Sequence, residues 1–172
     1  LSGGQRQRLA VARALLLKPR FIVADEPVSM LDLSIRAEIL ELLASLRDRH
    51  NITYLYITHD LSTARYIADT IAVMYLGKVV ELGLSERVLS DPLHPYTQAL
   101  MDAVPEPDPA NRLRERVVRI RGEVPSPVDV PAGCSLHPRC PYTKSICKVT
   151  EPQLLEVEPS RHVSCHLYPT TR

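Results

Sequence analysis

The sequence lacks the features that mark several common functional classes. No apolar run approaches the roughly 18 residues that a membrane-spanning helix requires. No basic, then apolar, then small-residue segment opens the chain as in a secretory signal. The chain also has no excess of one charge sign, because 21 basic and 20 acidic residues leave a net charge of +1. We therefore expect no membrane span and no charge-driven nucleic-acid binding, and the default compartment is the cytoplasm.

Glycine is scarce, and its placement excludes a phosphate-binding loop from this sequence. The pattern G-x-x-x-x-G-K-[ST] is not begun by any of the six glycines. The chain also has no initiator Met. We expect it to be a fragment of a longer protein, with a phosphate loop on the order of a hundred residues before Leu1. Such a fragment is expected not to hydrolyse ATP alone, because phosphoryl transfer depends on positioning that this loop supplies.

Helix and strand patterns alternate over the first half, which predicts an α/β layered fold. Apolar residues make up 45% of the chain, enough for a buried core. The predicted helices cover 5–17, 33–49, 61–68, 85–90 and 96–104, the buried parallel strands 21–24 and 52–57, and a hairpin 71–76 with 78–81. Most of the fifteen prolines come later, where 105–109 is a predicted linker and 116–120 a predicted strand. Residues 122–172 show little periodicity.

The chain opens with Leu-Ser-Gly-Gly-Gln, followed by Arg-Gln-Arg and a helical pattern. Ser2 is a good N-cap, and Gly3 and Gly4 carry no Cβ, so backbone N–H groups there can approach a ligand closely. A helix start with free N–H groups favours an anion such as phosphate. The alternative is an ordinary capped helix after a glycine turn.

A carboxylate pair and a histidine follow the two predicted strands. Asp25 and Glu26 end the first strand, and His59 comes just after the second. Because such strand ends are where α/β sheets bind ligands, the three side chains are expected to share one crevice. One carboxylate can serve Mg²⁺ through its water, and the other can take a proton from an attacking water.

In this order and spacing, the motifs resemble those of ABC ATPases. The opening five residues match the signature motif, Phe21–Pro27 the Walker B segment with its catalytic glutamate, and His59 the switch histidine. Ser29–Asp32 matches the D-loop, with Met30 where the family usually has Ala, and Asp32 is also a helix cap. The resemblance implies that residues 1–83 form the C-terminal part of a P-loop (RecA-like) ABC nucleotide-binding domain.

The resemblance also implies residue roles, partners and a location. Glu26 would polarise the attacking water, Asp25 would help hold Mg²⁺ and His59 would sense the γ-phosphate of ATP. The implied partners are a second ATPase subunit, identical or different, two transmembrane permease subunits and an extracytoplasmic substrate-binding protein, with no nucleic acid. The protein would lie on the cytoplasmic face of the membrane. The implied nucleotide-binding residues are Ser2, Gly3, Gly4, Gln5 and Asp32, the signature residues serving the partner's ATP.

The second half resembles oligopeptide and dipeptide importers of this family. The segments that carry the resemblance are Met74–Lys78, Asp91–Leu100 and Arg121–Pro127. Residues 84–109 would form a helical connector and 110–172 a small irregular Pro- and Cys-rich extension. Three alternatives are an oligosaccharide importer of the same subfamily, a DNA-repair or chromosome-structure ATPase, and a non-enzymatic binding module. The second usually has long heptad coils, which are missing here.

The four cysteines all lie in the tail, with the spacing C-x₅-C-x₆-C-x₁₇-C. This spacing differs from the C-x₂-C pairs of zinc ribbons. The family resemblance implies a [4Fe–4S] cluster or another metal on these cysteines, and the alternative is four reduced thiols of minor structural role. Three histidines nearby are interpreted as incidental, and a run of arginines as a solvated face or a contact with membrane subunits or lipid. These residues are Cys134, Cys140, Cys147 and Cys165; His137, His162 and His166; Arg112, Arg114, Arg116, Arg119 and Arg121.

Overall fold

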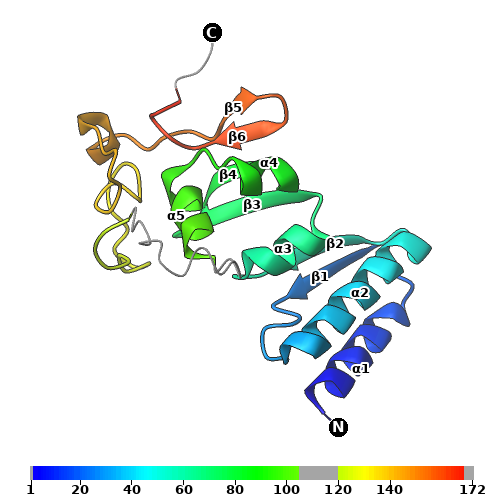
Figure 1. Ribbon diagram of the computed structural model, residues 1–172. Helices are drawn as coiled ribbons and strands as arrows, with labels where there is room; N and C mark the ends of the chain where they lie inside the picture. Colours follow the sequence, from blue (N-terminus) through cyan, green and yellow to red (C-terminus); the bar gives the residue numbers. More distant parts are fainter. Residues whose placement is uncertain (1, 105–119, 169–172) are drawn as a thin grey trace, which may run out of the picture. The chain divides into compact units, whose positions relative to one another are not determined.

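The computed structural model describes residues 2–104 and 120–168. It divides into two compact units, Leu1–Ala68 and Asp69–Arg172, whose elements are drawn in Figure 1. The predicted linker 105–109 and most of the predicted strand 116–120 lie outside the described residues, as do four of the five arginines of the basic run. Among the described residues, no helix is both long enough and apolar enough to cross a bilayer.

The first unit alternates helices with two parallel strands, as the sequence predicts. Its elements are α1 (Gly3–Leu15), β1 (Phe21–Asp25), α2 (Leu33–His50), β2 (Thr53–Ile57) and α3 (Leu61–Ile67). Strands β1 and β2 pair in parallel from Phe21 opposite Thr53 to Asp25 opposite Ile57. Asn51 caps the C-terminal end of helix α2. It adopts the left-handed conformation that Asn tolerates, and it donates its N–H to the carbonyl of Arg47.

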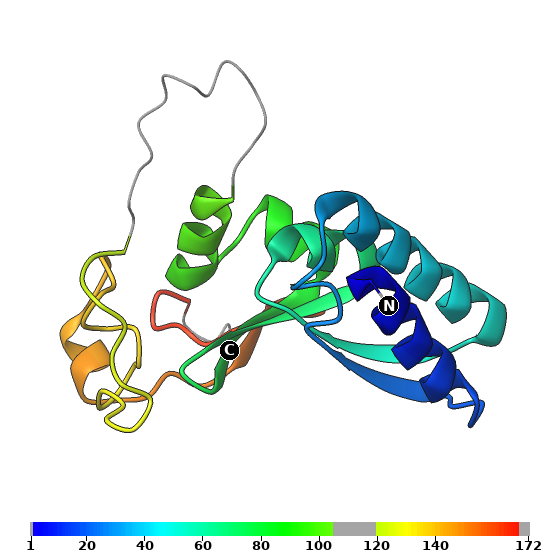
Figure 2. The same ribbon diagram turned by 90° about the horizontal axis from the view of Figure 1, so that it is seen from below.

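The core of the first unit lies on one face of these strands, the face that the helices cover in Figure 2. Tyr54 and Tyr56 of β2 pack against this core, whose buried members are Val28, Ile39, Leu40, Leu43 and Ile67. The opposite face is open, so the prediction of fully buried strands is wrong for half of their side chains. Its apolar side chains are 43–55% exposed: Phe21, Val23, Leu55 and Ile57. Parallel sheets normally have both faces covered.

The second unit is built on an antiparallel sheet of order β3-β4-β6-β5. The hairpin of β3 (Thr70–Tyr75) and β4 (Lys78–Leu84) confirms the predicted hairpin, and α4 (Ser85–Ser90) and α5 (Pro95–Ala103) match two predicted helices within a residue. The tail adds a 3₁₀ helix, η2 (Ser145–Lys148), and two short strands, β5 (Leu155–Glu158) and β6 (Arg161–Val163). The sequence does not predict these strands, because four and three residues are too few for a readable alternation.

Strand β6 holds the tail to the hairpin through main-chain pairing and one buried ion pair. Val163 pairs with Glu81 in the antiparallel register of β4 and β6. Arg161 and Glu81 are 2% and 0% exposed, and Arg161 Nη2 lies 3.0 Å from Glu81 Oε1. Because a charge inside a fold is costly unless it is paired, these two residues make the position of the tail against the hairpin specific.

Candidate functional site

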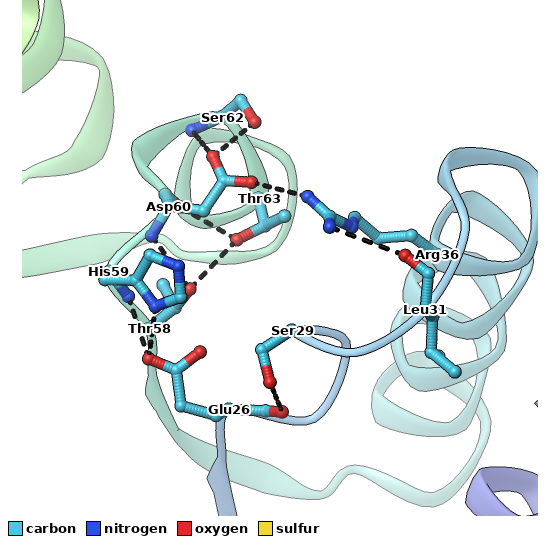
Figure 3. A network of polar contacts seen from close by, with 9 residues as sticks. All are labelled: Glu26, Ser29, Leu31, Arg36, Thr58, His59, Asp60, Ser62 and Thr63. Atoms are coloured by element: carbon cyan, nitrogen blue, oxygen red, sulfur yellow. Dashed lines mark hydrogen bonds and ion pairs between the residues drawn. The ribbon is translucent and has the colours of Figure 1, made fainter. Parts of the chain in front are cut away.

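The ends of β1 and β2 bring Glu26 and His59 into direct contact, as Figure 3 shows. Their parallel register puts both carboxyl ends at one edge of the sheet. Glu26 Oε1 lies 2.7 Å from His59 Nδ1, and it also accepts the His59 backbone N–H at 3.2 Å. Glu26 donates its own N–H to the carbonyl of Ile57 at 2.9 Å. The ends of the two strands therefore place Glu26 and His59 side by side.

The chemistry of this contact determines which imidazole nitrogen of His59 is bound to Glu26 and which is free to contact a ligand. A carboxylate can only accept, so the proton lies on Nδ1 of His59 and Nε2 points away from the pair. The His59 side chain is 77% exposed and that of Glu26 is 36% exposed. Glu26 thus keeps a carboxylate oxygen for another proton donor such as a water. A pair this exposed contributes little to stability, which favours a role in chemistry over one in folding.

A second polar group, not identified from the sequence, joins the segment after Glu26 to the segment after His59. Arg36 on α2 pairs with Asp60 at 2.9 Å and donates to the carbonyl of Leu31 at 3.5 Å (Figure 3). Asp60 is the N-cap of α3 and accepts the Ser62 N–H at 2.9 Å. Arg36 therefore links the predicted D-loop to the residue that follows His59.

The ionisation of Asp60 follows from this network. Burial acts to raise the pKa of Asp60, but hydrogen bonds from Ser62 and Thr63, together with the Arg36 guanidinium, bring the pKa below its usual range. Asp60 is therefore a stable anion that holds Arg36 in place. A sequence signal for it exists, since Asp directly before a predicted helix is a preferred N-cap.

The start of α1 has the predicted cap. The Gln5 N–H donates to Ser2 Oγ at 3.3 Å, and the Ser2 N–H donates to Gln5 Oε1 at 2.9 Å, a reciprocal capping box. Gly4 also has a packing role that the sequence does not reveal. A Cβ there would lie 2.6 Å from Ile35 Cγ2, so the missing side chain lets α1 approach α2 closely.

Two further candidate residues are placed as follows. Asp25 is exposed at the end of β1. Asp32 occupies the N-cap position of α2 as predicted, but its side chain makes no capping hydrogen bond. Within the described residues, no hydrogen bond or ion pair joins the capping box at Ser2 and Gln5 to the Glu26–His59 pair. The structure thus brings together the carboxylate and the imidazole but not the glycine-rich helix start.

The four cysteines, far apart in sequence, line one cavity in the second unit, which we call the cysteine cavity. All four are free thiols. Burial raises the pKa of Cys134 and Cys140, and it raises the pKa of Cys165 to about 11. The cysteine cavity is lined by Cys134, Cys140, Cys147 and Cys165 and, among other residues, by three imidazoles, those of His94, His137 and His166.

Backbone contacts fix the loops that carry these thiols. The Cys134 N–H donates to the Cys147 carbonyl at 2.8 Å, and the Lys144 N–H lies 3.4 Å from Cys147 Sγ. Gly133 has a φ of +69°, and a Cβ on it would lie 2.5 Å from the Cys147 carbonyl oxygen. Only glycine fits there without moving the two cysteine loops apart.

The cysteine cavity offers four sulfur donors from one unit of the chain. Across the described residues, no group of three or more His, Cys, Asp or Glu is arranged to hold one metal ion. A [4Fe–4S] cluster makes a different demand, because each of four thiolates binds a different iron. Four unbridged thiols around one cavity provide the donor set that such a cluster needs.

Comparisons with known families cover both halves of the chain. Residues 1–29 match the family described as ABC transporter, and residues 80–147 match the family described as oligopeptide/dipeptide transporter, C-terminal region. The oligopeptide transport ATP-binding protein AppF of Bacillus subtilis is 50% identical over 167 residues, 97% of this chain and 51% of that protein. The putative peptide import ATP-binding protein BOV_A0347 of Brucella ovis is 49% identical over 164 residues, 95% of this chain and 51% of its own length.

Solved structures agree with the α/β fold expected from the sequence. The ADP conformation of MJ1267, an ATP-binding cassette of an ABC transporter, is 33% identical with a TM-score of 0.50, over 57% of this chain and 40% of that chain. CbiO1 from Clostridium perfringens, part of an ABC transporter complex, gives 33% and 0.50, over 53% of this chain and 36% of its own. The chain spans about half the length of the curated relatives it matches.

Proposed function

Because the chain belongs to the ABC transporter ATP-binding proteins, in their oligopeptide/dipeptide branch, we propose that the intact protein is the ATP-hydrolysing subunit of a peptide importer. The observation that carries this proposal is the contact of Glu26 with His59 at the ends of two parallel strands. The open apolar face of these strands supports a longer intact protein, since parallel sheets are covered on both faces.

In the proposed mechanism, Glu26 accepts a proton from the water that attacks the γ-phosphate of ATP. His59 orients the Glu26 carboxylate through Nδ1 and presents Nε2 to the phosphate. Asp25 would help to hold Mg²⁺, and the ion would neutralise the phosphate charge. Ser2, Gly3, Gly4 and Gln5, at the positive end of α1, bind the ATP of the partner, together with Asp32.

The proposed assembly follows from these roles, because some residues act on the ATP of their own chain and others on the ATP of the partner. A second ATPase subunit supplies the other half of each ATP site, and two permease subunits with an extracytoplasmic binding protein handle the peptide. The protein then lies peripherally on the cytoplasmic side of the membrane. We assign residues 1–83 to the ATPase domain, 84–109 to a connector and 110–172 to the extension.

Transport by the intact protein tests this proposal directly. The intact protein, reconstituted in vesicles with its permease, its second ATPase subunit and its binding protein, is expected to accumulate a labelled oligopeptide only when ATP is supplied. A labelled oligosaccharide of similar size is the control substrate. Uptake of the sugar with no uptake of the peptide would favour the alternative importer, and ATP hydrolysis without either uptake would contradict a role in import.

We further propose that the cysteine cavity holds a [4Fe–4S] cluster. Three observations support it: the four thiols line one cavity, none is bridged, and the loops that carry them are held to each other by the Cys134–Cys147 backbone bond. Such a cluster would give the extension a redox-active centre and would hold its loops together, because binding free energy contributes to folding. The four cysteines would hold it as thiolates, so binding would release their thiol protons.

Anaerobic purification is expected to yield protein with about four irons and four acid-labile sulfides per chain, the stoichiometry of this cluster type. Replacing Cys140 with Ser is expected to remove most of this iron, because a hydroxyl is a poor ligand for iron in such a cluster. Iron analysis and visible absorption measure both. The variant Ser135→Ala, next to Cys134 but without a thiol, is the matched control and is expected to retain the iron. Wild-type protein free of iron and sulfide would exclude the cluster.

A further inference from the structure

The three imidazoles that line the cysteine cavity differ in where they place their protons. His137 Nδ1 lies 3.0 Å from the Cys134 carbonyl oxygen, and His166 Nε2 lies 2.9 Å from the Thr150 carbonyl oxygen. A carbonyl oxygen can only accept a hydrogen bond, so each of these nitrogens carries a proton and donates it in a hydrogen bond to the backbone. In their neutral forms, the other nitrogens of His137 and His166 therefore have only lone pairs to offer.

His94 has the opposite arrangement. Its Nδ1 accepts the backbone N–H of Tyr96 at 3.1 Å, where His94 caps α5 and Pro95 occupies the first turn. An accepting ring nitrogen carries no proton, so the proton of His94 lies on Nε2. Burial lowers the pKa of His94 to about 4, in agreement with a neutral ring.

The Nε2–H of His94 is the ring donor that remains once Nδ1 is used as the helix cap. The residue is 1% exposed, and its backbone N–H is already donated to Glu81 Oε2 at 2.9 Å. Within the described part of the chain, Nε2 has no hydrogen-bond acceptor, yet it is absent from the fully enclosed polar atoms that lack a partner. His94 is also one of the residues that line the cysteine cavity.

We infer that His94 is a positioning residue that donates a hydrogen bond from Nε2 to a sulfur in the cysteine cavity and thereby raises the reduction potential of the group bound there. The inference rests on the proposed cluster. A donor stabilises the more negative, reduced form more than the oxidised form. Hydrogen bonds to the sulfurs are one of the factors that set the potentials of such clusters.

The cap at α5 keeps the proton of His94 on Nε2. Because Nδ1 is held by Tyr96 N–H, the ring cannot turn its proton away without losing the cap of its own helix. The pairing of His94 N–H with the buried Glu81 fixes the backbone from the other side. Two contacts therefore fix the ring and the backbone of His94, and both leave Nε2–H unshared.

The test is the reduction potential of the intact protein, purified anaerobically with its iron and sulfide. His94→Asn and His94→Ser keep an oxygen that can cap Tyr96 N–H but end short of the cavity. Each is expected to shift the one-electron reduction equilibrium about tenfold toward the oxidised form. This shift corresponds to a reduction potential lower by about 59 mV. The matched control is His166→Asn, which lines the same cavity but donates to the backbone, and its potential is expected to equal that of the wild type.

A second measurement needs no variant to fold. In wild-type protein labelled with ¹⁵N-histidine, pulsed electron paramagnetic resonance of the reduced cluster is expected to show one coupled nitrogen, with an exchangeable proton lost in D₂O. This coupling is expected to persist in His166→Asn. A cluster of unchanged potential in both His94 variants, or no nitrogen coupling in the wild type, overturns the role of His94 and leaves the cluster intact. Wild-type protein without iron and sulfide overturns both.

Discussion

Replacing Glu26 with Gln is expected to lower the rate of ATP hydrolysis by the intact protein about 10²- to 10⁴-fold. The substitution keeps the shape of the side chain, and the amide oxygen can still accept the proton of His59 Nδ1 now 2.7 Å from Oε1. It removes the ability to take a proton from water. Binding of ATP is therefore expected to survive while hydrolysis fails.

Steady-state hydrolysis of Mg-ATP by the intact protein with its partner subunits measures this effect, and nucleotide affinity is measured in parallel. The matched control is Glu41→Gln, an exposed carboxylate on α2 in the same unit. The control is expected to hydrolyse ATP within about twofold of the wild type, since surface substitutions away from a site have small effects.

The comparison of the two variants separates a chemical role from a structural one. Loss of ATP binding together with hydrolysis in Glu26→Gln would mean that Glu26 positions the nucleotide and another residue accepts the proton. An unchanged rate would remove Glu26 from the mechanism. The open position of the pair, with Glu26 36% exposed, makes a folding defect an unsuitable explanation for either result.

The Glu26–His59 contact was predictable because parallel strands impose it. Two buried-strand patterns joined by a helix pattern predict neighbouring parallel strands, whose carboxyl ends then lie at one edge of the sheet. Arg36 was not predictable in the same way. Its partners, Asp60 and the carbonyl of Leu31, depend on the rotation of α2 relative to both loops, which periodicity does not determine.

The second unit shows where sequence patterns stop being informative. The hairpin and the short helices α4 and α5 have enough residues to display a period, and they were predicted. Strands β5 and β6 have four and three residues. Strand β6 pairs with β4 and β5 pairs with β6, and a buried ion pair joins residues 80 positions apart. Likewise, spacing alone does not show that four cysteines share a cavity with His94.

That ion pair is the basis of the largest expected effect on stability. The Glu81 carboxylate accepts from the Leu93 N–H at 3.0 Å, the His94 N–H at 2.9 Å and Arg161 Nη2 at 3.0 Å. Arg161 also donates to the carbonyl of Asp91 and lies 3.4 Å from Glu158. One buried pair thus joins β4, β6 and the turn before α5.

Replacing Arg161 with Met is expected to lower the free energy of unfolding by about 3–5 kcal/mol, because it leaves the Glu81 carboxylate buried without a counter-charge. Urea denaturation, followed by far-ultraviolet circular dichroism, measures the change. The matched control is Arg8→Met, which removes the same side chain from an ion pair with Glu38 in which both partners are about half exposed. The control is expected to lose about 1 kcal/mol or less.

The pair is not expected to be replaceable by two apolar residues, although many buried ion pairs are. In Arg161→Met with Glu81→Leu, the N–H groups of Leu93 and His94 lose their acceptor, and each such loss costs about 1–3 kcal/mol. The double variant should therefore stay less stable than the wild type, and its loss should be smaller than the sum of the two single losses. Full recovery of stability would show that Glu81 serves Arg161 alone, and that the turn carrying His94 is held by other contacts.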